Sequence, residues 1–164
     1  MMELAPNLTV QLVSCTIGCV GFALLFHNRR QDLLSNGIGA FLTWAIYLAF
    51  YHYVPSGFFA TGVTAAFVAA YSQLMARLNK APATVFLSIS IFPVVPGAHL
   101  YFMMFHIVMQ ETAEAVVEAK ALLLGCLGIT LGFFVIEILN KYLTLIIRHH
   151  LSHGKEPDLP YWFR

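Results

Sequence analysis

The sequence predicts an all-α, polytopic integral membrane protein with about five transmembrane helices, the fourth of which is broken at a proline motif. Composition gives the first support, because 59% of the 164 residues are hydrophobic, only 10% are charged and the mean hydropathy is +0.75. Soluble domains carry about 25% charged residues. The second support is the length of the apolar runs, since about 20 helical residues cross a bilayer core. No basic stripe indicates nucleic acid, so the lipid bilayer is the expected environment.

The expected spans follow one another in a single domain, residues 1–150. They lie at about 8–26, 36–54, 57–75, 83–109 and 121–140. The N-terminus lacks the basic region of a signal peptide, so the first run is expected to be retained. Apolar residues continue at helical spacing after the fifth span and predict an interfacial extension to 150. Residues 151–164 are expected to form a cytoplasmic tail.

The orientation follows from the distribution of Lys and Arg, which remain mostly on the cytoplasmic side of a membrane. With five spans, the loops after the first, third and fifth spans hold nearly all of these residues, namely Arg29, Arg30, Arg77, Lys80, Lys141, Arg148, Lys155 and Arg164. The other side holds Lys120, in a segment that also carries Glu111, Glu114 and Glu118. The sequence therefore predicts the N-terminus outside, the C-terminus inside and a full crossing by residues 83–109.

The fourth span contains two prolines and a glycine, Pro93, Pro96 and Gly97, close to its midpoint. Neither proline donates a backbone hydrogen bond, so the helix is interrupted twice. Irregular backbone at membrane depth is tolerated where it is buried in protein or lines a wet cavity. We therefore expect a break near mid-bilayer, with Gly97 supplying backbone freedom. A simple structural kink is the alternative, since prolines are frequent in membrane helices.

A break of this kind creates a helix N-terminus that attracts a carboxylate. The amides of Ala98, His99 and Leu100 are expected to face the break, and Tyr101, Ser88 and Ser90 are candidate polar contacts. The carbonyl end of the preceding half-helix attracts an ammonium group. The pair of ends suits a zwitterion such as an amino acid, and the positive end alone suits a dicarboxylate.

Two ionisable residues inside the spans are candidates for proton coupling, His99 and Glu137. Glu137 has a structural alternative, in which it pairs with Lys141 one turn on or reaches the inner interface. His106 is expected to be a polar anchor. Cys15, Cys19 and Cys126 lie in apolar runs and are interpreted as packing residues. No residue pattern indicates a metal or a cofactor.

Small residues recur at helical spacing in the third and fifth spans. They are expected to be helix-packing positions, because small side chains let helices approach closely in lipid. The positions are Gly62, Ala66 and Ala70 in the third span and Gly125, Gly128 and Gly132 in the fifth. Their extent predicts a partner chain or a homo-oligomer.

Several segments resemble the threonine/serine exporter family, and in particular its small subunit, which is equivalent to the C-terminal membrane half of the exporter. The segments are "GFALLFHNRRQDLLSNGIGAFLTWAIYL", "LMARLNKAPATVFLSISIFPVVPGAHLY" and the glycine-bearing last span. The most specific part is "KAPATVF" followed by "PVVPG" and Tyr101. The family motif maps onto Pro93, Pro96, Gly97 and Tyr101, and the position of His99 is more often small in relatives.

The resemblance implies efflux of small polar carboxylate metabolites from a bacterial inner membrane, with threonine and serine or dicarboxylates such as succinate as substrates. It also implies a larger partner subunit of the same family. A second hypothesis makes the chain a scaffold whose partner carries the transport path. A third, an intramembrane enzyme using His99 and Glu137, has no nucleophile or metal set to support it.

Overall fold

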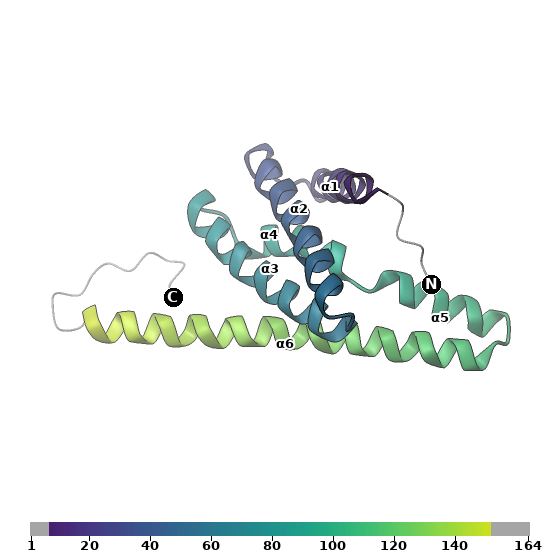
Figure 1. Cartoon of the computed structure of the whole chain (residues 1–164). Coiled ribbons are helices and arrows are strands. Elements are labelled where there is room, and N and C mark those ends of the chain that lie inside the picture. Colours follow the sequence, from purple (N-terminus) through teal and green to yellow (C-terminus); the bar gives the residue numbers. More distant parts are fainter. Residues whose placement is uncertain (1–6, 152–164) are drawn as a thin grey trace.

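The chain folds into helices joined by short turns (Figure 1). The structure is a computed structural model that describes the backbone of residues 7–151 and the side chains of residues 7–145. The elements are α1 (Leu8–Leu25), α2 (Arg30–Tyr53), α3 (Gly57–Asn79), α4 (Ala83–Ile91), the 3-10 turn η1 (Phe92–Val94), α5 (Gly97–Val108) and α6 (Thr112–Leu151). The predicted cytoplasmic tail lies outside the described residues, apart from its first residue.

Three of the turns use a residue in the left-handed backbone region. His27, Lys80 and Gln110 have φ values of 55°, 49° and 61° and follow α1, α3 and α5 respectively. A left-handed residue just after a helix satisfies carbonyl groups of its last turn and reverses the chain. The resulting turns are tight enough to place α2 beside α1, α4 beside α3 and α6 beside α5.

The predicted membrane class is confirmed. Within the described residues, α1, α2, α3 and α6 are each long and apolar enough to cross a membrane. The segment Ala83–Val94 and the helix Gly97–Val108 pass the same test together, bent by 51° at the break between them. When this pair is counted as one span, the described residues hold five candidate spans, and the fourth is broken at the proline motif.

Two helices begin earlier than the spans predicted from the sequence. Helix α2 starts at Arg30 rather than near residue 36, and α6 starts at Thr112 rather than near residue 121. The charged residues at these ends, Asp32 on α2 and Glu114 and Glu118 on α6, suggest loops when only hydropathy is considered. They are nevertheless good or tolerable helix residues, and an acidic side chain in a first turn is favourable.

Helix α6 is continuous over 40 residues and includes the predicted interfacial extension to 150. At a rise of 1.5 Å per residue it is about 60 Å long, roughly twice the thickness of a bilayer core. Figure 1 shows α6 running along one side of the molecule, with α5 beside its N-terminal part and α3 crossing its middle. Part of α6 therefore reaches beyond the apolar layer or lies tilted within it.

Helices α3 and α6 meet through a glycine seam formed by Gly62, Gly128 and Gly132. A Cβ added to Gly62 would lie 3.3 Å from the carbonyl oxygen of Gly128. A Cβ on Gly132 would overlap the carbonyl oxygen of Gly62 and lie 2.9 Å from the amide nitrogen of Ala66. The backbones are thus in direct contact. Ala70 differs from the packing expectation because it is exposed, whereas the neighbouring Ala69 is buried.

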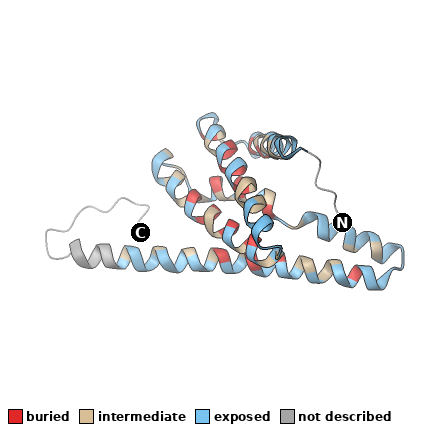
Figure 2. Cartoon of the chain, viewed as in Figure 1, coloured by how far each residue is buried: buried red, intermediate tan, exposed pale blue. Residues whose placement is uncertain are grey.

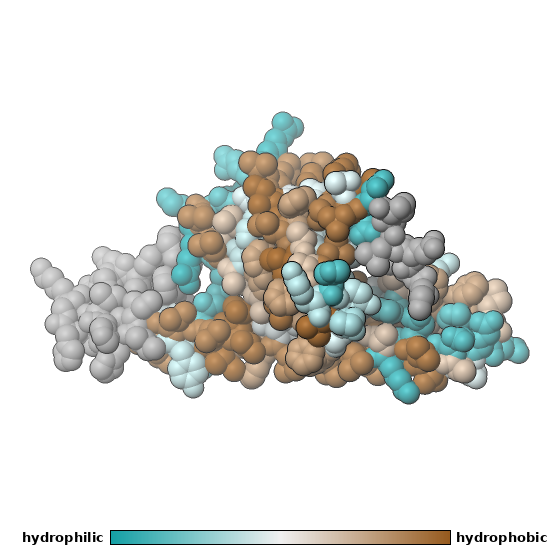
Figure 3. Space-filling model, in the orientation of Figure 1, coloured by the Kyte–Doolittle hydropathy of each residue, from teal (hydrophilic) through white to brown (hydrophobic). Residues whose placement is uncertain are grey.

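The remaining bundle packs α1, α2 and α4 together. Cys19, Ala23, Ala40 and Ile89 form its buried apolar cluster, with Cys15 and Leu33 against it. Buried residues gather where α2, α3 and α4 meet, and none lies on α5 (Figure 2). The surface seen in Figure 3 is largely apolar between more hydrophilic ends, as expected for a protein surrounded by lipid.

Candidate functional site

The break in the fourth span is built by η1 and a tight turn at Pro96. Pro96 has φ −76° and ψ 52°, and the amide of Gly97 donates to the carbonyl of Val95 at 2.7 Å, which together define an inverse γ-turn. The amide of Leu100 donates to the carbonyl of Pro96 at 3.3 Å. The prediction that the amide of Leu100 is a free donor is therefore wrong. Ala98 and His99 are the residues whose amides precede the first helical hydrogen bond of α5.

Gly97 does not supply the backbone freedom expected of it. Its φ is not positive, because the structure has no glycine in that region among the described residues. A Cβ added to Gly97 would meet nothing within 4 Å. The turn is made by Pro96 instead, and Gly97 leaves an open space in front of the first turn of α5.

The break packs against α6 at Gly125. A Cβ on Gly125 would lie 3.2 Å from Cγ of Pro96, and Gly125 is in the second turn after Lys120 on α6. The twelve residues Ala83–Val94 reach about 18 Å, which is more than half of a bilayer core. Along α6 the break faces a position five residues after Lys120.

Two histidine–glutamate pairs fasten α5 to α6 and the turn between them. His99 Nδ1 lies 2.7 Å from Glu118 Oε2, and His106 Nδ1 lies 2.7 Å from Glu111 Oε2. Helix α5 has no buried residue. These pairs, together with Pro96 at Gly125, hold an otherwise exposed helix in place. His106 has a polar partner in this arrangement, as an anchor would, and Glu118 places a carboxylate at the first turn of α5.

An aromatic stack ties the other side of the break to α1. The rings of Phe22 and Phe92 are stacked with centroids 4.7 Å apart, and Phe26 is stacked on Phe92 with centroids 6.3 Å apart. Phe92 opens η1, so its position sets the direction in which α4 ends. The break is thus fixed at both edges by side-chain contacts.

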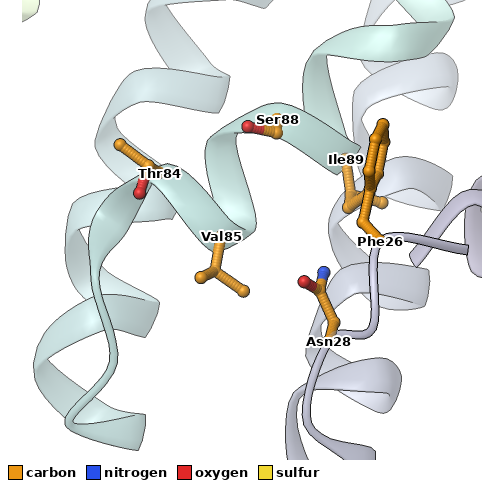
Figure 4. A pocket seen from close by; sticks show the side chains of 6 residues that line it. All are labelled: Phe26, Asn28, Thr84, Val85, Ser88 and Ile89. Carbon is orange, nitrogen blue, oxygen red and sulfur yellow. The ribbon is translucent and has the colours of Figure 1, made fainter. Parts of the chain in front are cut away.

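A cavity of about 240 Å³ opens beside α4, one to three turns before the break. Figure 4 shows its wall, with Phe26 and Asn28 on one side and four residues of α4 on the other, Thr84, Val85, Ser88 and Ile89. Three of the six residues are polar, Asn28, Thr84 and Ser88. The volume lies slightly below the usual range for drug-sized ligands and suits a smaller metabolite.

The predicted contact residues do not all meet. Ser88 lines the cavity, whereas Ser90 is fully buried and lies against Gly39 of α2. Tyr101 is 65% exposed on α5. Serines two residues apart on a helix point in nearly opposite directions, so Ser88 and Ser90 belong to different surroundings.

Glu137 has a different partner from the one considered for it. Its Oε1 accepts a hydrogen bond from Nε2 of Gln73 on α3 at 3.2 Å, and Nδ2 of Asn140 donates to Oε1 of Gln73. Gln73 therefore joins two residues of α6 that lie one turn apart. This geometry gives Glu137 a role in holding α3 to α6. Lys141 is not the partner of Glu137 in these pairs.

The residues that sequence reasoning missed are polar and buried between α2, α3 and α4. Asp32 and Asn36 are 2% and 0% exposed, and both lie where α2 packs against its neighbours. Asp32 falls before the predicted start of the second span, which hid it. A buried acid four residues before a buried amide on one helix face is a signal that helical periodicity could have found.

The site contains no ligand set for a metal within the described residues, because no three His, Cys, Asp or Glu side chains come together. Comparison with known proteins gives one positive result. A family model described as "Threonine/Serine exporter, ThrE" matches residues 11–139 of the chain. Neither a curated protein nor a solved structure matches the chain significantly.

Proposed function

Because the chain belongs to the threonine/serine exporter family and is a multi-pass membrane transporter protein, we propose that it is a subunit of a secondary exporter of small carboxylate metabolites. In this proposal it lies in the bacterial inner membrane with its N-terminus outside and its C-terminus inside. It acts with a larger subunit of the same family. Helix α5 is apolar and has no buried residue, so the larger subunit would supply the surface that covers it.

The observation that carries the proposal is the bent break itself. The bend of 51° directs the N-terminus of α5 away from α4, and the amides of Ala98 and His99 are unused by the helix. Helix N-termini at such breaks bind anionic groups in secondary transporters. The open space in front of Gly97 leaves room for a carboxylate there. The cavity at Asn28, Thr84 and Ser88 supplies a polar approach from the Arg29 side.

Among carboxylates, the surroundings of the break favour an amino acid over a dicarboxylate. Glu118 lies at the first turn of α5, where its carboxylate repels a second negative charge and attracts an ammonium group. A zwitterion such as threonine or serine presents both groups. A dicarboxylate such as succinate presents two negative charges, and the Glu118 carboxylate repels the second of them.

Efflux from cells loaded with threonine, and separately with succinate, tests the function. The cells express the chain together with the larger subunit, and the variant carries Pro93→Ala and Pro96→Ala. We expect threonine efflux to fall about tenfold or more, because straightening the helix removes the binding end. Normal efflux by a variant that reaches the membrane in the wild-type amount would contradict the site.

A scaffold role is the second candidate, favoured by the exposure of every residue near the N-terminus of α5. In that case the partner alone carries the transport path. Crosslinking with a photoreactive threonine analogue separates the two proposals. Labelling of residues 88–101 of this chain supports the transport path here, and labelling of the partner alone supports the scaffold.

A further inference from the structure

We propose that Asp32 is the proton-carrying residue of the exporter and that Asn36 and Ser90 hold a short chain of water between it and the broken span. The inference rests on the proposed transport function and names the ion that drives it. It assigns coupling to a residue other than the two considered from the sequence, His99 and Glu137.

Nε1 of Trp44 on α2 is buried without a hydrogen-bond partner among the described residues, and so are atoms of three further polar side chains on α2 and α4. They are Oδ2 of Asp32, both amide atoms of Asn36 and Oγ of Ser90. The residues are 2%, 0% and 0% exposed. A buried polar group without a partner destabilises the fold, and nearly all such groups in folded proteins are bonded to protein or ordered water. Three together indicate a place for water and a transferable proton.

The three side chains lie along one line of the fold. Asp32 and Asn36 are one turn apart on the same face of α2, and Gly39 continues that face. A Cβ at Gly39 would overlap Oγ of Ser90, so the hydroxyl lies directly against α2 at this level. From Asp32 to Gly39 the rise along the helix is about 10 Å, a distance that roughly three or four hydrogen-bonded steps of about 2.8 Å cover. Ser90 lies one turn before Pro93.

Other buried hydroxyls nearby are different. Thr43, Thr64 and Ser72 each donate to the carbonyl of the residue four positions earlier, at 2.7 Å. Their hydrogen bonds are closed within their own helices and require no water. The absence of partners is thus specific to Asp32, Asn36 and Ser90 within this group.

The separation along α2 favours a proton over a metal ion. Asp32 and Ser90 are too far apart to ligate one ion, whereas a proton passes between waters. In the transfer, a hydronium O–H bond breaks, an O–H bond forms on the Asp32 carboxylate and a neutral water remains. The reverse step releases the proton to water on the inner side, where α2 begins. Protonation also removes a negative charge from a buried position, which is the usual property of an intramembrane coupling acid.

The elements packed against α2 carry other titratable or charged groups, whereas α4 and η1 have none. Those on α1, on α3 and the residue after it, in the loop before α2 and in the first turn of α2 are Cys15, Cys19, His27, Arg29, Arg30, Tyr71, Arg77 and Lys80. The hydroxyl of Tyr71 donates to the carbonyl of Ser35 at 2.6 Å and is committed to that bond. Asp32 is the one carboxylate among these groups in the described residues.

The experiment measures two rates in membrane vesicles that contain this chain and the larger subunit, with L-threonine as the probe and succinate as a second probe. One rate is export driven by an imposed pH gradient, and the other is exchange of labelled for unlabelled probe at equal pH. In Asp32→Asn we expect exchange within about twofold of wild type and a loss of about tenfold or more in the response to the gradient. Asp32→Glu, which keeps a carboxylate, retains that response.

A second variant guards against misfolding. Ser90→Ala removes a buried hydroxyl that has no protein partner, so it should leave stability unchanged or raise it, and it should lower the gradient response severalfold. Thr43→Val is the matched control, because it removes a buried hydroxyl whose bond is internal to α2; its gradient response should equal that of wild type. A wild-type gradient response in Asp32→Asn, or in Ser90→Ala if Asp32→Asn does not assemble, overturns the inference. If the wild-type chains export neither probe, the proposed function fails instead.

Discussion

His99 and Glu118 join the first turn of α5 to α6, with Nδ1 of the histidine 2.7 Å from Oε2 of the carboxylate. The two side chains are 47% and 26% exposed. Together with the contact between Pro96 and Gly125, the pair fixes where the second half of the broken span begins. The position of the proposed carboxylate site is therefore set by α6 as much as by the prolines.

Removing either member of this pair should weaken the attachment of α5. We expect His99→Ala and Glu118→Gln each to lower stability slightly, with a coupling energy of about 0.5 kcal/mol between them, because partly exposed pairs contribute about 0.2–1 kcal/mol. Thermal unfolding of the two single variants and the double variant in detergent measures the coupling. Strictly additive effects would show that the pair does not stabilise the fold.

Adding a methyl group to the glycine seam should separate α3 from α6. A Cβ on Gly128 would lie 2.5 Å from the carbonyl oxygen of Phe58 and would overlap Oγ1 of Thr61. Gly128→Ala should therefore cost about 1–3 kcal/mol in stability, the usual effect of overpacking. Gly18→Ala is the control, since a Cβ there meets nothing within 4 Å. Equal stability of the two variants would argue against close contact at the seam.

Loss of the hydroxyl of Tyr71 should destabilise the junction of α2 and α3. Its hydrogen bond to the carbonyl of Ser35 is 2.6 Å long and links residues of α3 and α2 that are 36 positions apart. Tyr71→Phe should lower the unfolding free energy by about 1 kcal/mol. Tyr101→Phe, at an exposed tyrosine, should change it by less than about 0.5 kcal/mol. Denaturant titration of both variants gives the comparison, and a neutral Tyr71→Phe would count against the bond.

Replacing both prolines should straighten the fourth span. Two helical arms of about 18 Å that meet at a bend of 51° end about 3–4 Å closer together than the same arms in line. Spin labels at positions 84 and 108 should therefore move apart by about that distance in the Pro93→Ala, Pro96→Ala variant. Labels at Phe59 and Leu74, both exposed on α3, should keep their separation. An unchanged distance across the break would show that packing, rather than proline, maintains the bend.

Hydropathy and the two prolines were sufficient to predict the membrane class, the break between α4 and α5 and the approximate position of each long helix. They act locally, through the length of an apolar run and a missing hydrogen-bond donor. Exact helix starts were not predictable in this way, because Asp32 and Glu118 are charged residues that helices accept once packing or a partner stabilises them. Asp32 was missed for that reason, and Glu118 was assigned to a loop.

The details of the site depend on contacts between distant parts of the chain. The position of the break beside α6 follows from the contact between Pro96 and Gly125, and the surroundings of Ser90 follow from its packing against Gly39. The partner of Glu137 is Gln73 on α3. Each of these contacts joins residues that are far apart in the sequence, so spacing along one helix does not reveal them.

The length of α6 has a mechanical consequence for transport. This single helix pairs with α5 through Glu118, contacts Pro96 through Gly125 and packs against α3 through Gly128 and Gly132. A change of angle at the break therefore also changes the packing at the glycine seam, because the contacts between α5 and α6 make the two helices move together. The glycine seam is then the point about which α6 rotates against α3, and α5 is attached to the part of α6 before that point. The same helix meets α3 again further along, where Nδ2 of Asn140 donates to Oε1 of Gln73.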